Sequence, residues 1–122
     1  MLKKFAYVAA AAAVLAPAAF AGECNAKEVE AAGGTAANLV RARVETVVAI
    51  QGKEMINLSA CKTKGAAFEI EYKYNFMGPD GYYWVEGEGS ITGASGTITF
   101  KKLSDKLESA AKAKNVTLAS RD

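Results

Sequence analysis

The chain has 122 residues, of which 51% are hydrophobic and 23% charged, with 15 lysines and arginines, 13 aspartates and glutamates, and no histidine. Without histidine, the usual general base, the Ser-His and Cys-His nucleophile pairs and imidazole metal sites are all excluded. The net charge is nearly neutral, so the protein lacks the positive electrostatic field that attracts the phosphate backbone of nucleic acids. Nucleic acid is therefore not expected as a partner.

The first 21 residues are typical of a secretory signal peptide, with a basic start, an alanine-rich apolar stretch and a small-residue end, MLKKFAYVAAAAAVLAPAAFA. A membrane anchor is the alternative, but a spanning helix needs roughly 20 strongly apolar residues, and Pro17 interrupts this run. We expect cleavage after Ala21, a single exported domain over residues 22–122 in the periplasm or outside the cell, and no stable membrane insertion. Losing Lys3 and Lys4 would leave 13 basic and 13 acidic residues.

Two cysteines, Cys24 and Cys61, remain after the predicted cleavage. Export delivers them to an oxidising compartment, where an even number of cysteines indicates a disulfide. A reactive thiol pair is the alternative, but it lacks the Cys-x-x-Cys spacing. We predict that Cys24 and Cys61 form a disulfide.

Residues 25–32, NAKEVEAA, are predicted as a short N-terminal helix. Asn25 can cap its first turn, and Glu28 stands three residues later, as in a capping box. Gly33 and Gly34 are expected to end the helix, because glycine is a poor helix former.

Residues 38–50 fit two patterns. A helix would place on one face Ala36, Val40, Val44, Val47 and Val48. A strand would instead place alternate residues from Val40 to Ile50 on one face. The many β-branched side chains favour the strand, which we predict here, with the helix as the open alternative.

The clearest pattern is a β-hairpin over residues 68–91. Large apolar side chains alternate with polar ones at Phe68, Ile70, Tyr72, Tyr74 and Phe76. The sequence Gly78-Pro79-Asp80-Gly81 is typical of a turn. A turn of these four residues pairs Phe76 with Tyr83, Tyr74 with Val85, Tyr72 with Gly87, Ile70 with Gly89 and Phe68 with Ile91 on one face, and Lys73 with Glu86 and Glu71 with Glu88 on the other.

Further strands are predicted on both sides of the hairpin. Residues 55–61 should place Ile56, Leu58 and Ala60 on one face, and residues 97–101 form a strand after a glycine-rich turn. Ser104 is expected to cap a C-terminal helix. The predicted fold class is α+β: a small antiparallel meander of four or five strands, with the short N-terminal helix and the C-terminal helix packed on one face.

The carboxylates of the hairpin could act as general acids and bases if burial raised the pKa of one of them, or their clustered oxygens could hold calcium, although the loop spacing of known calcium motifs is missing. However, Glu69, Glu71, Glu86 and Glu88 alternate with apolar residues, which is the ordinary pattern of a solvated sheet face. We therefore predict no catalytic residues, no metal site and no cofactor, and the protein is not expected to be an enzyme.

Tyr82 and Trp84 project with the glutamates in this register. Exposed tryptophan and tyrosine beside a turn are typical of a recognition surface, because they offer large contact areas at low entropic cost. The alternative is that another layer of the fold covers them. The candidate binding residues are Tyr82, Trp84, Glu86, Glu88 and, in the turn, Asp80.

The segment LVRARVETVVAIQG, followed by a second strand, resembles the strand after the long helix of cystatins, exported protease inhibitors with a QxVxG loop. The order of residues 47–52 departs from that loop, and no long helix is predicted before it. We therefore assign no family.

The predicted function is a non-enzymatic periplasmic or secreted binding module that uses the aromatic and acidic face of the hairpin. One alternative is a small carrier that holds an apolar ligand between sheet and helix. The other is a protease-inhibitor-like exported domain. The expected partner is an unidentified protein or a small apolar ligand.

Overall fold

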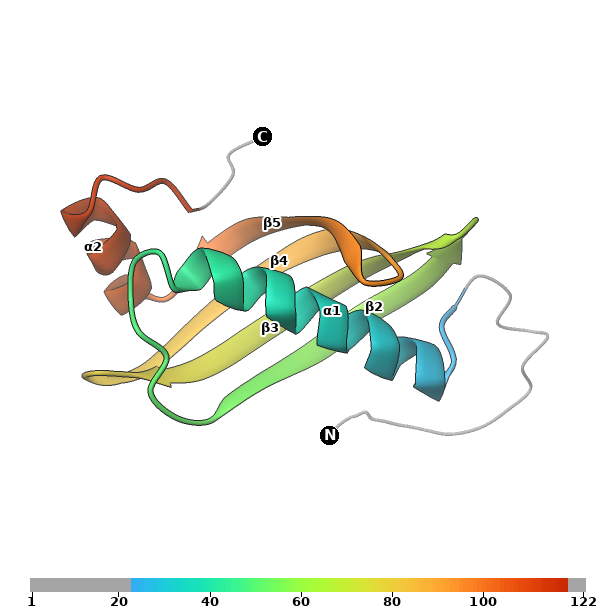
Figure 1. The fold of residues 1–122 in the computed structure, drawn as a ribbon, viewed down its shortest axis with the longest axis horizontal. Coiled ribbons are helices and arrows are strands. Elements are labelled where there is room, and N and C mark those ends of the chain that lie inside the picture. Colours follow the sequence, from blue (N-terminus) through green and yellow to red (C-terminus); the bar gives the residue numbers. More distant parts are fainter. Residues whose placement is uncertain (1–22, 119–122) are drawn as a thin grey trace.

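The computed structural model describes residues 23–118, which form one four-stranded antiparallel sheet and two helices (Figure 1). The elements are α1 (Ala26–Val44), β2 (Glu54–Lys64), β3 (Ala67–Gly78), β4 (Gly81–Thr92), β5 (Ser95–Leu103) and α2 (Asp105–Ala113). The strands lie in the order β2-β3-β4-β5. The predicted α+β meander is confirmed with four strands, while the predicted signal peptide lies outside the described residues.

Helix α1 is much longer than predicted, since it continues through Gly33 and Gly34 to Val44. The predicted strand over residues 38–50 is therefore wrong, and the helical alternative is correct up to Val44. The reason is packing: residues spaced by four form a stripe that is buried against the sheet, at Ala32, Ala36, Val40 and Val44. Burial of this stripe outweighs both the β-branched composition and the two glycines.

The same correction removes the strand that resembled part of a cystatin. Residues 45–48 form the turn that ends α1, and β2 begins only at Glu54. A long helix is present, but the segment after it is not a strand.

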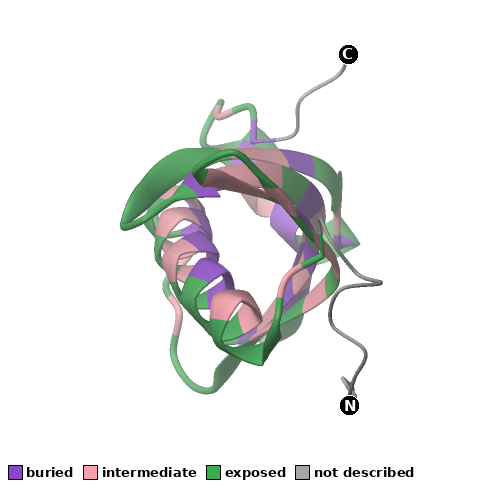
Figure 2. Ribbon diagram, turned by 90° about the vertical axis from the view of Figure 1, so that its right-hand side faces the viewer, coloured by how far each residue is buried: buried purple, intermediate pink, exposed green. Residues whose placement is uncertain are grey.

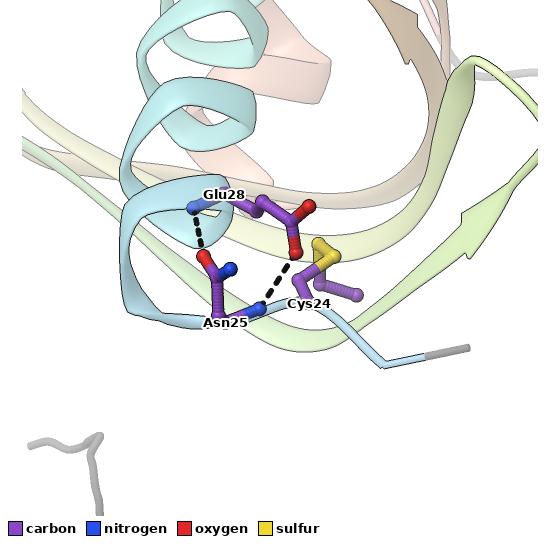
Figure 3. The surroundings of a disulfide bond; sticks show 4 residues. Cys24, Asn25 and Glu28 are labelled. Atoms are coloured by element: carbon purple, nitrogen blue, oxygen red, sulfur yellow. Dashed lines mark hydrogen bonds between the residues drawn. A yellow bond between two sulfur atoms is a disulfide. The ribbon is translucent and has the colours of Figure 1, made fainter. Parts of the chain in front are cut away.

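The start of α1 is fixed by a capping box and a disulfide. The Glu28 backbone N–H donates to the Asn25 side chain, and the Asn25 backbone N–H donates to the Glu28 carboxylate, each at 2.8 Å (Figure 3). Cys24, just before the helix, is bonded to Cys61 of β2, so the predicted disulfide is confirmed. The predicted helix start is therefore confirmed, whereas the predicted end is not.

The central hairpin has the predicted register. β3 and β4 pair from Phe68 opposite Ile91 to Gly78 opposite Gly81, and every pair named above is observed. Strict alternation places Tyr72, Tyr74 and Phe76 inside, where each is at most 3% exposed. Phe76 and Tyr83 stack with their ring centroids 5.1 Å apart, which supports the cross-strand packing.

A β-bulge in β2 changes the predicted faces of that strand. The pairing with β3 shifts between Leu58 and Ala60, so Ala60 lies opposite the outward Glu71 and Cys61 opposite the inward Ile70. The prediction that Ala60 shares a face with Ile56 and Leu58 is therefore wrong. The extra residue turns Cys61 toward the side on which α1 packs.

Helix α2 begins after Ser104, but Ser104 does not cap it with its side chain. Its hydroxyl accepts a hydrogen bond from the Trp84 backbone N–H at 3.2 Å, and its own N–H donates to the Trp84 carbonyl. Ser104 is thus the N-cap residue, and the predicted helix start is confirmed, but its side chain makes no capping hydrogen bond and joins α2 to β4 instead.

Both helices pack on the same side of the sheet. Figure 2 shows α1 inside the curve of the strands, with buried residues facing inward. The core includes residues from both helices and from the inner face of the sheet, among them Val40, Tyr74, Phe100, Leu107 and Ala111. Within residues 23–118, the opposite face of the sheet carries no helix; we call it the outer face.

Three tyrosines of the inner face have raised pKa values. Burial raises the pKa of Tyr72, and burial together with a hydrogen bond to Glu54 raises that of Tyr74. The hydrogen bond that Tyr83 donates to Asp80 raises the pKa of Tyr83 to about 12. The folded chain therefore keeps these phenolic protons at pH values where free tyrosine, with a pKa of about 10, loses them.

This retention predicts alkaline unfolding. Above pH 10 the unfolded chain releases tyrosine protons that the folded chain still holds, so the free energy of unfolding should fall as pH rises toward 12. Denaturant titrations between pH 8 and about 12 measure this slope. The variant Tyr83→Phe should show a shallower fall, and equal slopes in the two proteins would contradict the prediction.

Candidate binding face

The predicted binding residues of β4 lie on the outer face. Tyr82 is 53% exposed, Glu88 is also exposed, and Trp84 and Glu86 are half-buried between their neighbours. Because both helices pack on the inner face, no other described element covers Tyr82 and Trp84. The alternative of a covering layer is thus not supported within the described residues.

Two adjacent cross-strand rows bring apolar side chains together on this face. Met55 of β2, Asn75 of β3 and Trp84 of β4 form one row, and Met77 and Tyr82 form the next. Among the described residues, the exposed large hydrophobic side chains are Met55 at 60%, Tyr82 at 53% and Met77 at 42%. Met77 and Tyr82 lie in the row next to that of Trp84, and Met55 lies in the row of Trp84 with Asn75 between them. We call the set of Met55, Met77, Tyr82 and Trp84 the apolar patch.

Polar contacts hold the aromatic rings of the patch in place. The Lys73 ammonium lies 5.0 Å from the centre of the Trp84 ring and 3.8 Å from the Glu86 carboxylate. The Tyr82 hydroxyl donates to the Asn75 side-chain oxygen. A ring that is already positioned loses less conformational entropy when it is covered by a partner.

An open hollow of about 570 Å³ adjoins the patch along the strands. It crosses all four strands, and its polar lining consists of Asn57, Ser59, Glu71, Lys73, Glu86, Glu88 and Lys101. We call this region the charged hollow. Glu86 and Glu88, which were predicted from the sequence, thus lie with charged and polar groups from the neighbouring strands.

Asp80 is separate from these residues. It lies in the turn, accepts the Tyr83 hydroxyl at 2.5 Å, and its backbone carbonyl accepts from Lys106 of α2 at 2.6 Å. The hydrogen bond from Tyr83 lowers the Asp80 pKa, with a smaller contribution from the charge of Lys106. Asp80 therefore links the turn to the inner-face side and to α2 and does not join the outer face.

A second polar cluster joins α1 to the sheet. Arg41 donates to both oxygens of Glu54 at 2.9 and 3.2 Å, and the Tyr74 hydroxyl donates to the same carboxylate. Desolvation opposes the charge on Glu54, but the hydrogen bonds from Tyr74 and Arg41 outweigh it and lower the Glu54 pKa. The cluster holds the end of α1 on the sheet.

The carboxylates of the outer face differ in exposure. Glu69, Glu71 and Glu88 are exposed, and Glu86 is half-buried. Burial or strong coupling is what typically raises the pKa of a carboxyl group that acts as a general acid. Within residues 23–118, no three histidine, cysteine or acidic side chains group as metal ligands. In the same range, no helix has the length and apolar character required to cross a membrane.

Some neighbours of Trp84 on the outer face were not predicted from the sequence. Met55, Asn57 and Ser59 reach the outer face from β2, and Lys101 reaches it from β5. Placing them requires the register of β2 with β3 and of β4 with β5, and both of these pairings contain a bulge. The position of Met55 opposite Asn75 can be deduced only when the register of β2 with β3 is known.

We compared the chain with family models, curated proteins and solved structures, and found no match.

Proposed function

We propose that this protein is a non-enzymatic exported binding module that contacts a partner through the outer face of its sheet. The observation that carries the proposal is the apolar patch, in which the exposed methionines, Tyr82 and Trp84 occupy two adjacent cross-strand rows. Tryptophan and tyrosine are common at the energetic centres of interfaces, and methionine adapts to varied apolar surfaces. The disulfide is compatible with an oxidising compartment outside the cytoplasm.

The carrier alternative has less support. Such a carrier would hold its ligand between the helices and the inner face of the sheet. Side chains that are at most 1% exposed occupy this region, including Ala36, Val40, Tyr74, Phe76 and Phe100. We therefore favour contact through the outer face over a ligand held inside.

Trp84→Ala is expected to weaken partner capture without unfolding the domain. Truncating a tryptophan at the centre of an interface typically costs about 2 kcal/mol or more, which corresponds to roughly 30-fold in affinity. Because Trp84 is half-buried on the face away from the core, its loss should reduce the free energy of unfolding by only about 1 kcal/mol. Pull-down from periplasmic extract, with the domain comprising residues 22–122 as bait, captures the partner. Titration of that partner then measures the affinities of the unchanged domain and of Trp84→Ala.

Lys112→Ala is a suitable control, since Lys112 is exposed on α2, away from the outer face. This variant should capture the partner as the unchanged domain does. Trp84 is the one tryptophan of the chain, so its fluorescence should shift when the partner binds. Equal capture by Trp84→Ala, or a large loss of its thermal stability, would overturn the proposal.

A further inference from the structure

We infer that the partner of the outer face is a protein segment that presents a large apolar side chain and, about four residues away from it, one lysine or arginine. This inference rests on the proposed function and specifies the chemistry of the partner. It follows from the charges in the hollow and from their distance to the apolar patch.

The carboxylates of the charged hollow differ in their neighbours. Its lining includes the carboxylates of Glu71, Glu86 and Glu88 and the ammonium groups of Lys73 and Lys101. Glu86 is paired with Lys73, and the exposed Lys102 lies directly opposite it on β5. A cation from a partner would therefore be complementary to Glu71 and Glu88.

Two of these carboxylates repel each other. Glu71 and Glu88 lie directly opposite in the register of β3 and β4, both exposed on the outer face. Like charges directly opposite each other on neighbouring strands destabilise a sheet. Among the described residues, no ion pair within 4.0 Å involves either carboxylate. A cation from the partner placed between them would relieve this repulsion.

The distance between the apolar patch and Glu88 is too large for one side chain of a partner to contact both, so the partner must be a chain segment. Glu88 is four residues after Trp84 on β4, so the two positions are about 13 Å apart along the strand. In an extended peptide, residues i and i+4 share a face and are separated by the same distance. Such a segment can cover the apolar patch with one side chain while its cation reaches Glu71 and Glu88.

Three capped ten-residue peptides without tryptophan provide the test. All carry one leucine in a serine and threonine background: the first has lysine four residues after it, the second has glutamate there, and the third has lysine five residues after it. Trp84 fluorescence reports binding to the unchanged domain. Titration calorimetry, which needs no tryptophan, measures binding to every variant, Trp84→Ala included. The first peptide should bind at least ten-fold more tightly than the second at low salt, and the third should bind less tightly than the first. The difference in affinity between the first and second peptides should shrink as salt is added, because the carboxylates of Glu71 and Glu88 are exposed.

Charge reversal supplies the matched variant. In the double variant Glu71→Lys with Glu88→Lys, the preference should reverse toward the glutamate peptide. If that protein fails to fold, Glu88→Gln should reduce the preference for the lysine peptide several-fold in a domain with unchanged thermal stability. Lys112→Glu, on α2, should leave the preference unchanged.

The outcomes separate the inference from the proposed function. If the lysine and glutamate peptides bind equally, and Trp84→Ala binds neither, the inference of a cation on the partner is wrong. The proposed function of the outer face would still be supported. Absence of binding by all three peptides would also overturn this inference, while capture that depends on Trp84 would still support the proposed function. Binding that is insensitive to Trp84→Ala would overturn both.

Discussion

Gly87→Ala is expected to destabilise the domain by about 3 kcal/mol or more. An added Cβ would lie 1.9 Å from the Thr99 carbonyl oxygen and 2.6 Å from the Tyr72 hydroxyl. The Tyr72 hydroxyl donates a hydrogen bond to the Thr99 carbonyl at 3.2 Å, which links β3 to β5. The methyl group would break this bond and push the Thr99 backbone away. Denaturant unfolding of the oxidised protein measures the loss.

Gly34→Ala is the matched control, because it is the same chemical change at a position with free space. Gly34 is exposed within α1, and an added Cβ meets no atom within 4 Å. Alanine there should increase the free energy of unfolding by about 0.5 to 1 kcal/mol, since glycine is the poorer helix former. If Gly87→Ala were as stable as Gly34→Ala, the close packing of Tyr72 over β4 would be contradicted.

Removing the disulfide with Cys24→Ala and Cys61→Ala together is expected to cost roughly 3 to 4 kcal/mol. The two cysteines are 37 positions apart, and the closed loop contains all of α1. Without this crosslink the unfolded chain gains conformational freedom, and the start of α1 is left with its capping box and one backbone bond from Cys24 to Cys61. Denaturant unfolding compares the variant with the oxidised protein.

Reduction of the unchanged protein provides the control for this variant. Treated with a thiol reductant, it should unfold at the same denaturant concentration as the double alanine variant. Hydrogen exchange should increase first in residues 26–34, where α1 contains Gly33 and Gly34. A double variant within about 1 kcal/mol of the oxidised protein would show that the crosslink contributes little.

The hairpin could be predicted from the sequence because its determinants are local. Side chains alternate from Phe68 to Phe76, and Pro79 and Gly81 define a turn, so the register and both faces follow from a short stretch. The capping box at Asn25 and Glu28 is local in the same way. The positions of Tyr82 and Trp84 on the outer face follow from the hairpin alone.

The other features depend on contacts between distant residues. The valines of α1 favour a strand by propensity, and only the sheet that buries Val40 and Val44 makes the helix preferable. The bulge near Ser59 has no local turn sequence, yet it determines where Cys61 points. Ser104 has the residue type of a helix cap but forms its hydrogen bond with β4. Of the apolar patch, only Tyr82 and Trp84 of β4 were therefore predicted.

The bulges also affect how the two sheet edges could meet other chains. The pairing of β2 with β3 shifts register near Ser59, and Glu23 forms a β-bridge with Lys62 of β2. The pairing of β5 with β4 shifts register between Glu86 and Gly87. On β5, the Ile98 carbonyl accepts a hydrogen bond from Arg43 at 3.2 Å. Such irregular edges are poor templates for strand addition, which protects a concentrated protein from forming ordered aggregates. A protein whose sheet margins resist polymerisation can display an apolar surface at lower risk of self-assembly.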